Sequence, residues 1–158
     1  MSGVNTSAGI RFYIGPAYSS PIQETSAGLT AALAALEALT YVEVGEVEDA
    51  GEIGDTVGTT TFTALSNRRA RKYKTIFDAG EQQLVIGLDG ADAGQAALKA
   101  AQKVKSDYAF KVDYGDGSVD YYVGQVTSVR KALGTAESIR KLNVGIAINS
   151  AIVEDNGA

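Results

Sequence analysis

The stretch DYAFKVDYGDGSVDYYVGQVTSV, Asp107 to Val129, decides the fold. Its first half alternates apolar and polar residues with period two, which is typical of a strand with one buried face. Gly115, Asp116 and Gly117 then supply the positive backbone dihedrals that a tight turn requires, and the alternation resumes. The stretch therefore predicts a β-hairpin. The side chains expected on its buried face are Tyr108, Phe110, Val112, Tyr114, Val119, Tyr121 and Val123.

This face is too large to stay in water, so other elements must cover it. The segment SIRKLNVGIAINSAIV, residues 138–153, predicts a last strand with one apolar side. An Ala-rich segment from Asp92 to Lys105 predicts a helix, with Asp92 as N-cap and Gln95 at the reciprocal capping-box position. The expected apolar positions are Leu142, Val144, Ile146, Ile148 and Ile152 in the strand, and Ala97, Leu98, Ala101 and Val104 in the helix.

The other predicted elements extend or cap this sheet. Residues 10–15 predict a strand. Strand character returns at Thr75, with a turn around Asp78, Ala79 and Gly80 and a strand at 82–88. Residues 28–40 predict a short helix that is apolar nearly all round and should be buried, either under the sheet or against another subunit. Residues 41–49 predict a strand in which Gly45 forms a bulge. Glu43, Glu46 and Glu48 in this strand are expected to point away from the core.

The length and the ends of the chain indicate one domain. The 158 residues suffice for one real core. We expect a flexible arm at 1–9, a single domain at 10–153 and a disordered tail at 154–158. The N-terminus has neither a charged nor an apolar region typical of a signal peptide, and no apolar run reaches the roughly 20 residues that span a bilayer.

The absence of Cys and His excludes several chemistries for this chain alone. A zinc site, a haem, a nucleophilic Cys and every His-based acid–base mechanism lack their side chains. A calcium loop at DYGDGSVD is disfavoured because Gly115 and Gly117 occupy ligand positions. Asp113, Asp116 and Asp120 fit a solvated turn better than an acid–base pair. We expect no catalytic residue, no metal site and no cofactor.

Residues 50–74 show no sustained periodicity and predict a long loop, which we interpret as the functional feature of the chain. One base and eight acids precede residue 68, whereas thirteen bases and eleven acids follow from there. The basic run is open to three interpretations: phosphate binding, a solvated face, or an interface with the acidic block 43–55 of a neighbouring copy. The bases are Arg68, Arg69, Arg71, Lys72 and Lys74.

Several motifs, in this order, resemble the major tail tube proteins of long-tailed bacteriophages, whose fold the tube protein of type VI secretion shares. The resemblance covers roughly residues 41–153. It rests on YVEVGEVEDAGE at 41–52, TTFTAL at 60–65, FDAGEQQLVIGLDGADAGQAAL at 77–98, DYGDG at 113–117 and YYVGQVTSV at 121–129.

The resemblance implies a mainly β protein, a β-sandwich or partly closed barrel with one flanking α-helix and a long inter-strand loop. It implies a virion structural protein without enzymatic activity, made in the host cytoplasm and built into the tail. Subunits would form hexameric rings that stack into a hollow tube, which delivers DNA without binding it specifically. The partners would be the tape measure, tail terminator and tail tip or baseplate proteins, and no membrane.

Two residue sets follow as candidate sites. The basic run would meet Glu52, Asp55 and the rest of the acidic block on a neighbouring subunit. Glu43, Glu46 and Glu48 are candidates for the lumen lining, which should be neutral to acidic because bases would trap the passing phosphates. The alternative from another class is a small β-sandwich module that binds carbohydrate or nucleic acid.

Overall fold

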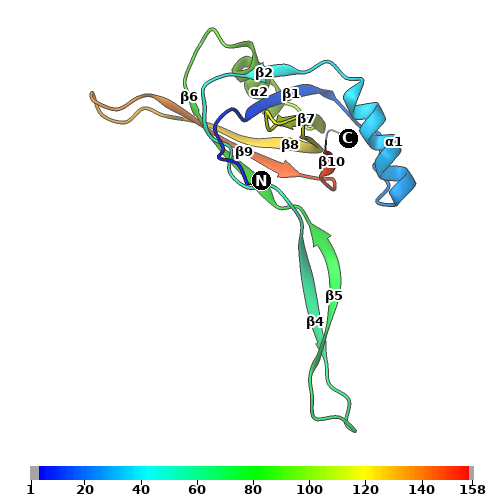
Figure 1. Ribbon diagram of the computed structural model, residues 1–158. Helices are drawn as coiled ribbons and strands as arrows, with labels where there is room; N and C mark the ends of the chain where they lie inside the picture. The colour runs from blue at the N-terminus through cyan, green and yellow to red at the C-terminus, as the bar shows by residue number, and fades with distance from the viewer. Residues whose placement is uncertain (1–3, 157–158) are drawn as a thin grey trace.

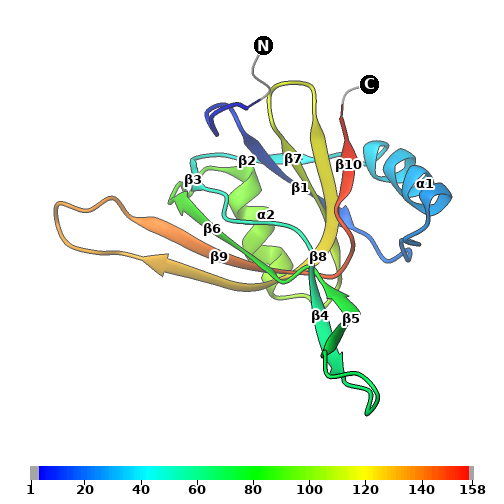
Figure 2. The same cartoon turned by 60° about the horizontal axis from the view of Figure 1, so that its bottom comes forward.

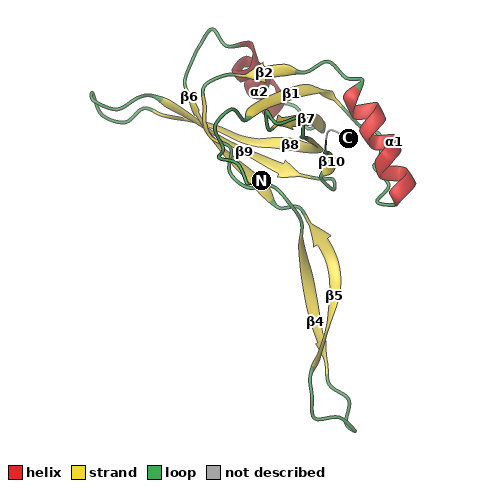
Figure 3. Ribbon diagram, in the orientation of Figure 1, coloured by secondary structure: helices red, strands yellow, loops and turns green. Residues whose placement is uncertain are grey.

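A computed structural model describes residues 4–156, which form ten strands and two helices (Figure 1, Figure 3). The mainly β class is therefore confirmed. In chain order the elements are β1 (Arg11–Ala17), α1 (Ser26–Glu37), β2 (Val42–Val44), β3 (Val47–Asp49), β4 (Thr56–Phe62), β5 (Arg71–Asp78), β6 (Glu81–Gly87), α2 (Ala93–Gln102), β7 (Tyr108–Asp113), β8 (Val119–Ala132), β9 (Lys141–Ile148) and β10 (Val153–Asp155).

Eight strands form one antiparallel sheet in the order β2-β1-β7-β8-β9-β6-β3, with β10 paired to β8. The two edge strands β2 and β3 are consecutive in the chain, with only Gly45 and Glu46 between them. The sheet therefore curls until its two edges meet at this link, which we call the Gly45–Glu46 corner. This architecture agrees with a partly closed barrel and corrects the expectation of one bulged strand at 41–49.

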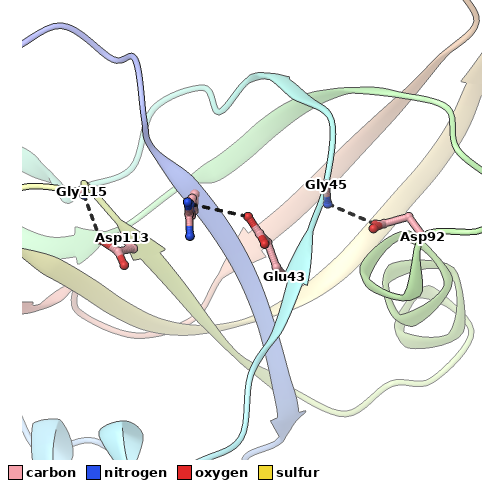
Figure 4. A network of polar contacts seen from close by, with 6 residues as sticks. Glu43, Gly45, Asp92, Asp113 and Gly115 are labelled. Carbon is pink, nitrogen blue, oxygen red and sulfur yellow. Dashed lines mark hydrogen bonds and ion pairs between the residues drawn. The ribbon is translucent and has the colours of Figure 1, made fainter.

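The positive φ of Glu46, 61°, turns the chain at the corner, and α2 holds it there. Asp92 caps α2 by accepting from the Gln95 N–H at 3.0 Å, and the same Oδ2 accepts from the Gly45 N–H at 3.1 Å (Figure 4). The buried Gln95 amide donates to the carbonyls of Gly45 and Gly87. The N-cap is thus as predicted, but Gln95 tethers the corner instead of completing a capping box.

The hairpin predicted over 107–129 is confirmed as β7 and β8, paired from Tyr108↔Gly124 to Asp113↔Val119. Gly115 and Gly117 have positive φ in its turn. Both faces of the hairpin are buried, whereas the alternation predicted one buried face for all seven apolar side chains. Tyr121 and Val123 instead lie on the face opposite Phe110 and Val112. Phe110 and Tyr122 stack inside the curled sheet, and Phe110 also stacks on Phe12.

Two cores explain this double burial. The larger core fills the curled sheet and receives Leu98 and Ala101 of α2. The smaller core lies on the other face of β7 and β8, where Ala32 and Leu36 of α1 cover Tyr121. The expected helix at 28–40 is present as α1, capped by Thr25, whose hydroxyl accepts from the Gly28 N–H at 3.0 Å. Only Ala32 and Leu36 of this helix are buried in the subunit, so the sheet covers one side of it and not all.

The ends of the chain differ in part from expectation. Residues 4–9 contain no helix or strand, and residues 1–3 of the expected arm lie outside the described residues. The expected disordered tail is wrong for Glu154 and Asp155, which belong to β10 and pair with Asp120 and Val119. Residues 157–158 lie outside the described residues.

Candidate functional site

The predicted loop at 50–74 is instead largely a β-hairpin, formed by β4 and β5 in a two-stranded sheet of its own. It projects from the body in both views (Figure 1, Figure 2). The prediction that residues 50–74 lack secondary structure is wrong because periodicity detects a strand only when one of its faces is buried. Every residue of β5 is exposed, so its sequence carries no such alternation.

Large apolar side chains on this hairpin face water. Ile76 is 76% exposed and Phe77 62% exposed, and Phe62, Leu65 and Tyr73 are exposed as well. The Arg71 guanidinium lies over the Phe62 ring, 5.5 Å from its centroid. A two-stranded hairpin without other cover is marginally stable in water. The hairpin therefore presents a surface that gains stability when another chain covers it.

The root of the hairpin is fixed to the body. The side-chain N–H of the buried Gln82 donates to the Ala50 carbonyl at 2.8 Å. The side-chain oxygen of Gln82 accepts from the Tyr122 hydroxyl. On the returning strand, the Gly80 carbonyl accepts from the Ile148 N–H at 3.0 Å. Both strands of the hairpin thus leave the body from anchored positions.

Opposite charges occupy the two ends of the hairpin. The five bases of the predicted basic run lie at or near its tip, where Arg71, Lys72 and Lys74 begin β5 and Arg68 and Arg69 precede it. At the root, a cleft of about 360 Å³ is lined by four acidic residues among its walls. These are Glu52, Asp55, Asp78 and Glu81. The sequence analysis named Glu52 and Asp55 as interface candidates, whereas Asp78 and Glu81 join them in the cleft only through the fold.

The structure divides the acidic block that the sequence treated as one unit. Glu43 and Glu46 lie at the Gly45–Glu46 corner, and Figure 4 shows Glu43 on the strand beside β1. Glu43 pairs with Arg11 at 3.9 Å, and Glu48 pairs with Lys141 at 2.8 Å. All three proposed lumen carboxylates are exposed. None of the three lines the root cleft that contains Glu52 and Asp55.

A second acidic region lies where α1 meets β10. The Glu37 carboxyl hydrogen-bonds with Asp155, which together with burial and repulsion raises the pKa of Glu37. Asp120 on β8 faces Glu154 on β10 in the strand register. Burial raises the pKa of Asp120 and the charge of Glu154 adds to this, although the hydrogen bond from the Tyr114 hydroxyl opposes it. Sequence spacing gave no signal for these long-range carboxylate pairs.

The DYGDG turn uses its carboxylates locally. Asp113 accepts from the Gly115 N–H at 2.9 Å, and Asp116 accepts from the Ser118 N–H at 3.0 Å. Within residues 4–156, no three His, Cys, Asp or Glu side chains are grouped to hold a metal ion. Neither helix of the described chain has the length and apolar character needed to cross a membrane.

Residues 24–151 match the family of lambda phage tail tube proteins. The match covers more than three quarters of the chain. The chain belongs to this family. It is thus a bacteriophage tail tube subunit, a component of the virion tail with a structural, non-enzymatic role. The family implies assembly into a stacked tube with other tail components. Membership also decides against a carbohydrate- or nucleic-acid-binding module as the main role.

Two solved structures share the fold despite low identity. A chain in the cryo-EM structure of the anti-feeding prophage baseplate, which is 6-fold symmetrised, matches with a TM-score of 0.70 and 8% identity over 99% of both chains. The SPP1 tail tube, a hybrid structure from solid-state NMR and cryo-EM, matches with a TM-score of 0.54 and 10% identity, covering 92% of this chain and 76% of that one. A comparison with curated proteins gives no match.

Proposed function

We propose that the subunit forms six-membered rings that stack into a hollow tube, through which DNA passes into the host. The observation that carries this proposal is the β4–β5 hairpin, which exposes apolar side chains over its whole length. Such a hairpin is unfavourable on a free subunit and is stabilised when a neighbouring copy covers it. The 6-fold symmetrised neighbour of similar fold supports six subunits per ring.

The hairpin is the contact between stacked rings in this proposal. Its basic tip, Arg68 to Lys74, meets the acidic root of a subunit in the next ring, where Glu52 and Asp55 lie. An exposed ion pair contributes only about 0 to 1 kcal/mol, so the apolar side chains supply most of the affinity. The charges set the register of the two copies and speed their encounter.

The lumen is lined by the Gly45–Glu46 corner, with Glu43, Glu46 and Glu48 facing the passing DNA. The ion pairs of Glu43 with Arg11 and of Glu48 with Lys141 support a surface close to neutral. A neutral or acidic lining does not bind the DNA phosphates, whereas a basic lining would bind them with release of counterions. The basic tips are expected to lie away from the lumen.

The subunit is made in the host cytoplasm and joins the tail there. Its partners in the tail are the tape measure protein, the tail terminator and the tail tip or baseplate. A tube whose two ends present different surfaces, hairpin tips at one end and acidic roots at the other, supports distinct partners at each end. DNA passes through without sequence-specific binding.

Charge reversal at the tip tests the stacking contact. We expect R69E/R71E to slow tube formation at least tenfold at low salt while leaving the subunit folded, because like charges now meet at the root. Negative-stain microscopy and light scattering measure tubes and rate, and circular dichroism checks folding. The companion reversal E52K/D55K should restore part of the rate. Wild-type assembly should also slow as salt is raised, since exposed charges are screened.

Normal assembly of R69E/R71E at low salt would show that the basic run is only a solvated face. Reversal of two bases elsewhere, Lys99 of α2 and Lys103 at its C-cap (K99E/K103E), is the matched control and should assemble at the wild-type rate. A uniform monomer at high concentration for the wild-type protein would contradict the tube itself.

Ordering of the hairpin on assembly is a separate element of the proposal. Its amides at residues 56–62 and 71–78 belong to an isolated sheet, so they should exchange rapidly in the free subunit. In the tube, burial against the next ring should slow their exchange by at least tenfold. Equal exchange in the two states would contradict this ordering.

A further inference from the structure

A second projection of the molecule is not explained by stacking. The distal ends of β8 and β9 and the loop between them, residues 130–141, extend from the body as a basic arm, which we call the β8–β9 arm (Figure 2). Leu133 is 59% exposed and Ile139 75% exposed on this arm. Its loop is folded, since the Ser138 N–H donates to the Thr135 carbonyl at 3.0 Å and the two hydroxyls lie 2.9 Å apart.

The arm also carries bases that have no acidic partner within residues 4–156. Lys141 pairs with Glu48 at 2.8 Å. In the part of the chain that the structure describes, Arg130, Lys131 and Arg140 have no carboxylate within 4.0 Å. The arm thus offers two exposed aliphatic side chains between three unpaired cations.

The opposite side of the body has the complementary features. A groove of about 270 Å³ lies between α1 and β10, and its apolar walls include Leu29, Leu33 and Ile152. A cavity of about 150 Å³ already holds a benzene ring, so this groove has room for the aliphatic side chains of one arm. The arm and α1 lie on opposite sides of the molecule in both views (Figure 1, Figure 2), and α1 supplies Leu29 and Leu33 of the groove.

The rim of this groove is acidic. Glu154 is among its walls, and Glu37 lies with Asp155 beside it, close enough for the two carboxyl groups to share a hydrogen bond. Glu37 is also the last residue of α1, whose final turn contains no base. The carbonyl end of a helix is the negative end of its dipole, so an acid there is unfavourable and a cation is favoured. The site therefore lacks the positive charge that the β8–β9 arm presents.

We propose that the β8–β9 arm of one subunit docks into the α1–β10 groove of the next subunit in the same ring. Leu133 and Ile139 enter the apolar groove, and Arg130 and Arg140 reach the carboxylates of Glu37 and Glu154. Because the arm and α1 lie on opposite sides, each subunit offers one arm and receives one arm. Such a head-to-tail contact closes into a ring when the rotation between successive copies closes, as the proposed six-membered ring requires. The inference rests on the proposed ring, and it assigns the contact within the ring to a surface distinct from the β4–β5 hairpin.

Cysteine cross-linking tests this contact, because the chain contains no Cys of its own. The probe is the double variant T30C/I139C, with one thiol in the groove and one on the arm. Mild oxidation of its rings should give a covalent ladder that ends at the ring size. A mixture of the single variants T30C and I139C should give dimers only. The matched control T30C/L65C, with the second thiol on the equally exposed tip of the β4–β5 hairpin, should cross-link at least tenfold more slowly.

Microscopy of the same samples before oxidation separates the two ideas. Tubes that form without any ladder from T30C/I139C would overturn the arm contact and leave the tube standing. Failure of the wild-type protein to form rings would overturn both. As an independent measure, R130E/R140E should slow ring formation about tenfold, and E37R/E154R should restore it when mixed with that variant. Unchanged assembly of R130E/R140E would also overturn the contact.

Discussion

Single side chains in this subunit connect segments that are far apart in the chain. Gln82 joins the Tyr122 hydroxyl to the Ala50 carbonyl, and so it links the core to the root of the β4–β5 hairpin. Asp92 joins the start of α2 to Gly45 across 47 positions of sequence. Gly94 is required beside it, since a Cβ there would lie 2.3 Å from the Glu43 carbonyl oxygen. These contacts fix the root of the β4–β5 hairpin and the Gly45–Glu46 corner to the body.

Replacing Gln82 with Met should destabilise the subunit by about 2 to 4 kcal/mol. The substitution leaves the Tyr122 hydroxyl and the Ala50 carbonyl without partners, and each buried unsatisfied group costs about 1 to 3 kcal/mol. Urea unfolding of the free subunit measures the change. In the Q82M background, the second substitution Y122F should cost less than it does alone, because the hydroxyl has already lost its partner. An unfolding midpoint of Q82M at the same urea concentration as that of the wild-type protein would contradict this role.

Asp120 should make the free subunit lose stability as pH rises. Its pKa is raised above the ordinary 3.8 in the folded state, chiefly by burial, so ionisation favours the unfolded chain. The stabilisation is complete below about pH 3.8 and is lost as pH rises through the raised pKa. The slope is at most about 1.4 kcal/mol per pH unit for one proton, and less here because Asp120 is partly exposed.

The variant D120N tests this dependence, because Asn keeps an acceptor for the Tyr114 hydroxyl and has no charge to lose. Urea midpoints measured from pH 4 to pH 7 should fall less steeply for D120N than for the wild-type protein. The control E137Q, at an exposed position in the β8–β9 arm, should follow the wild-type curve. Parallel curves for D120N and wild type would show that Asp120 does not titrate with folding.

At the scale of elements, the body and the β4–β5 hairpin have different energetic roles. The body has two cores on the two faces of β7 and β8. The hairpin contributes no buried hydrophobic residue to either core. Stability of the free subunit and its ability to stack between rings should therefore reside in separate elements.

Shortening the β4–β5 hairpin should separate these roles. Replacing residues 60–73 with Asn-Gly joins the paired residues Thr59 and Lys74 by a two-residue turn of the type that hairpins favour. The unfolding free energy in urea should stay within about 0.5 kcal/mol of the wild-type value, because the removed residues are exposed. Electron microscopy should show rings that fail to stack. A shortened subunit that unfolds, or that still forms tubes, would contradict this division.

At the scale of the whole molecule, the subunit is a connector with surfaces in different directions. The hairpin extends one way, the β8–β9 arm another, and α1 lies opposite the arm (Figure 1). In the proposed tube the hairpin makes the contact between stacked rings, and the β8–β9 arm and α1 make the contact within a ring. The Gly45–Glu46 corner then remains to face the lumen, with its carboxylates partly balanced by Arg11 and Lys141.

Converting the corner to a basic surface should turn the tube into a DNA trap. We expect E43K/E46K tubes assembled in the presence of a labelled short duplex to retain it after sedimentation, while wild-type tubes do not. Phosphate binding by bases releases counterions, so retention should fall steeply as salt is raised. The control E137K, on the β8–β9 arm, should retain no duplex. Absence of retention by E43K/E46K, or a map with Arg68 to Lys74 along the lumen, would contradict the lumen assignment.

The sequence by itself determined the elements in which burial imposes a regular spacing of apolar residues. The hairpin at 107–129, the strand at 82–88, α2 and β9 were predicted because burial imposes a period on the sequence. The predicted last strand, residues 138–153, is longer than β9, which ends at Ile148. The turn at Gly115 to Gly117 was predicted because few residues tolerate positive φ. The motifs in order also identified the tail tube family, which the match over 24–151 confirms.

Only the tertiary structure decided the features that depend on distant or absent neighbours. The β4–β5 hairpin has no buried face, so apolar and polar residues do not alternate regularly along its strands. For this reason the sequence predicted a loop at residues 50–74. The corner turns two consecutive short strands into opposite edges of the sheet. Glu46 turns the chain there, and the distant residues Asp92 and Gln95 hold the corner in place. The acidic root and the acidic groove likewise combine residues from separate segments, since charge in a sequence becomes a surface only when the chain brings its segments together.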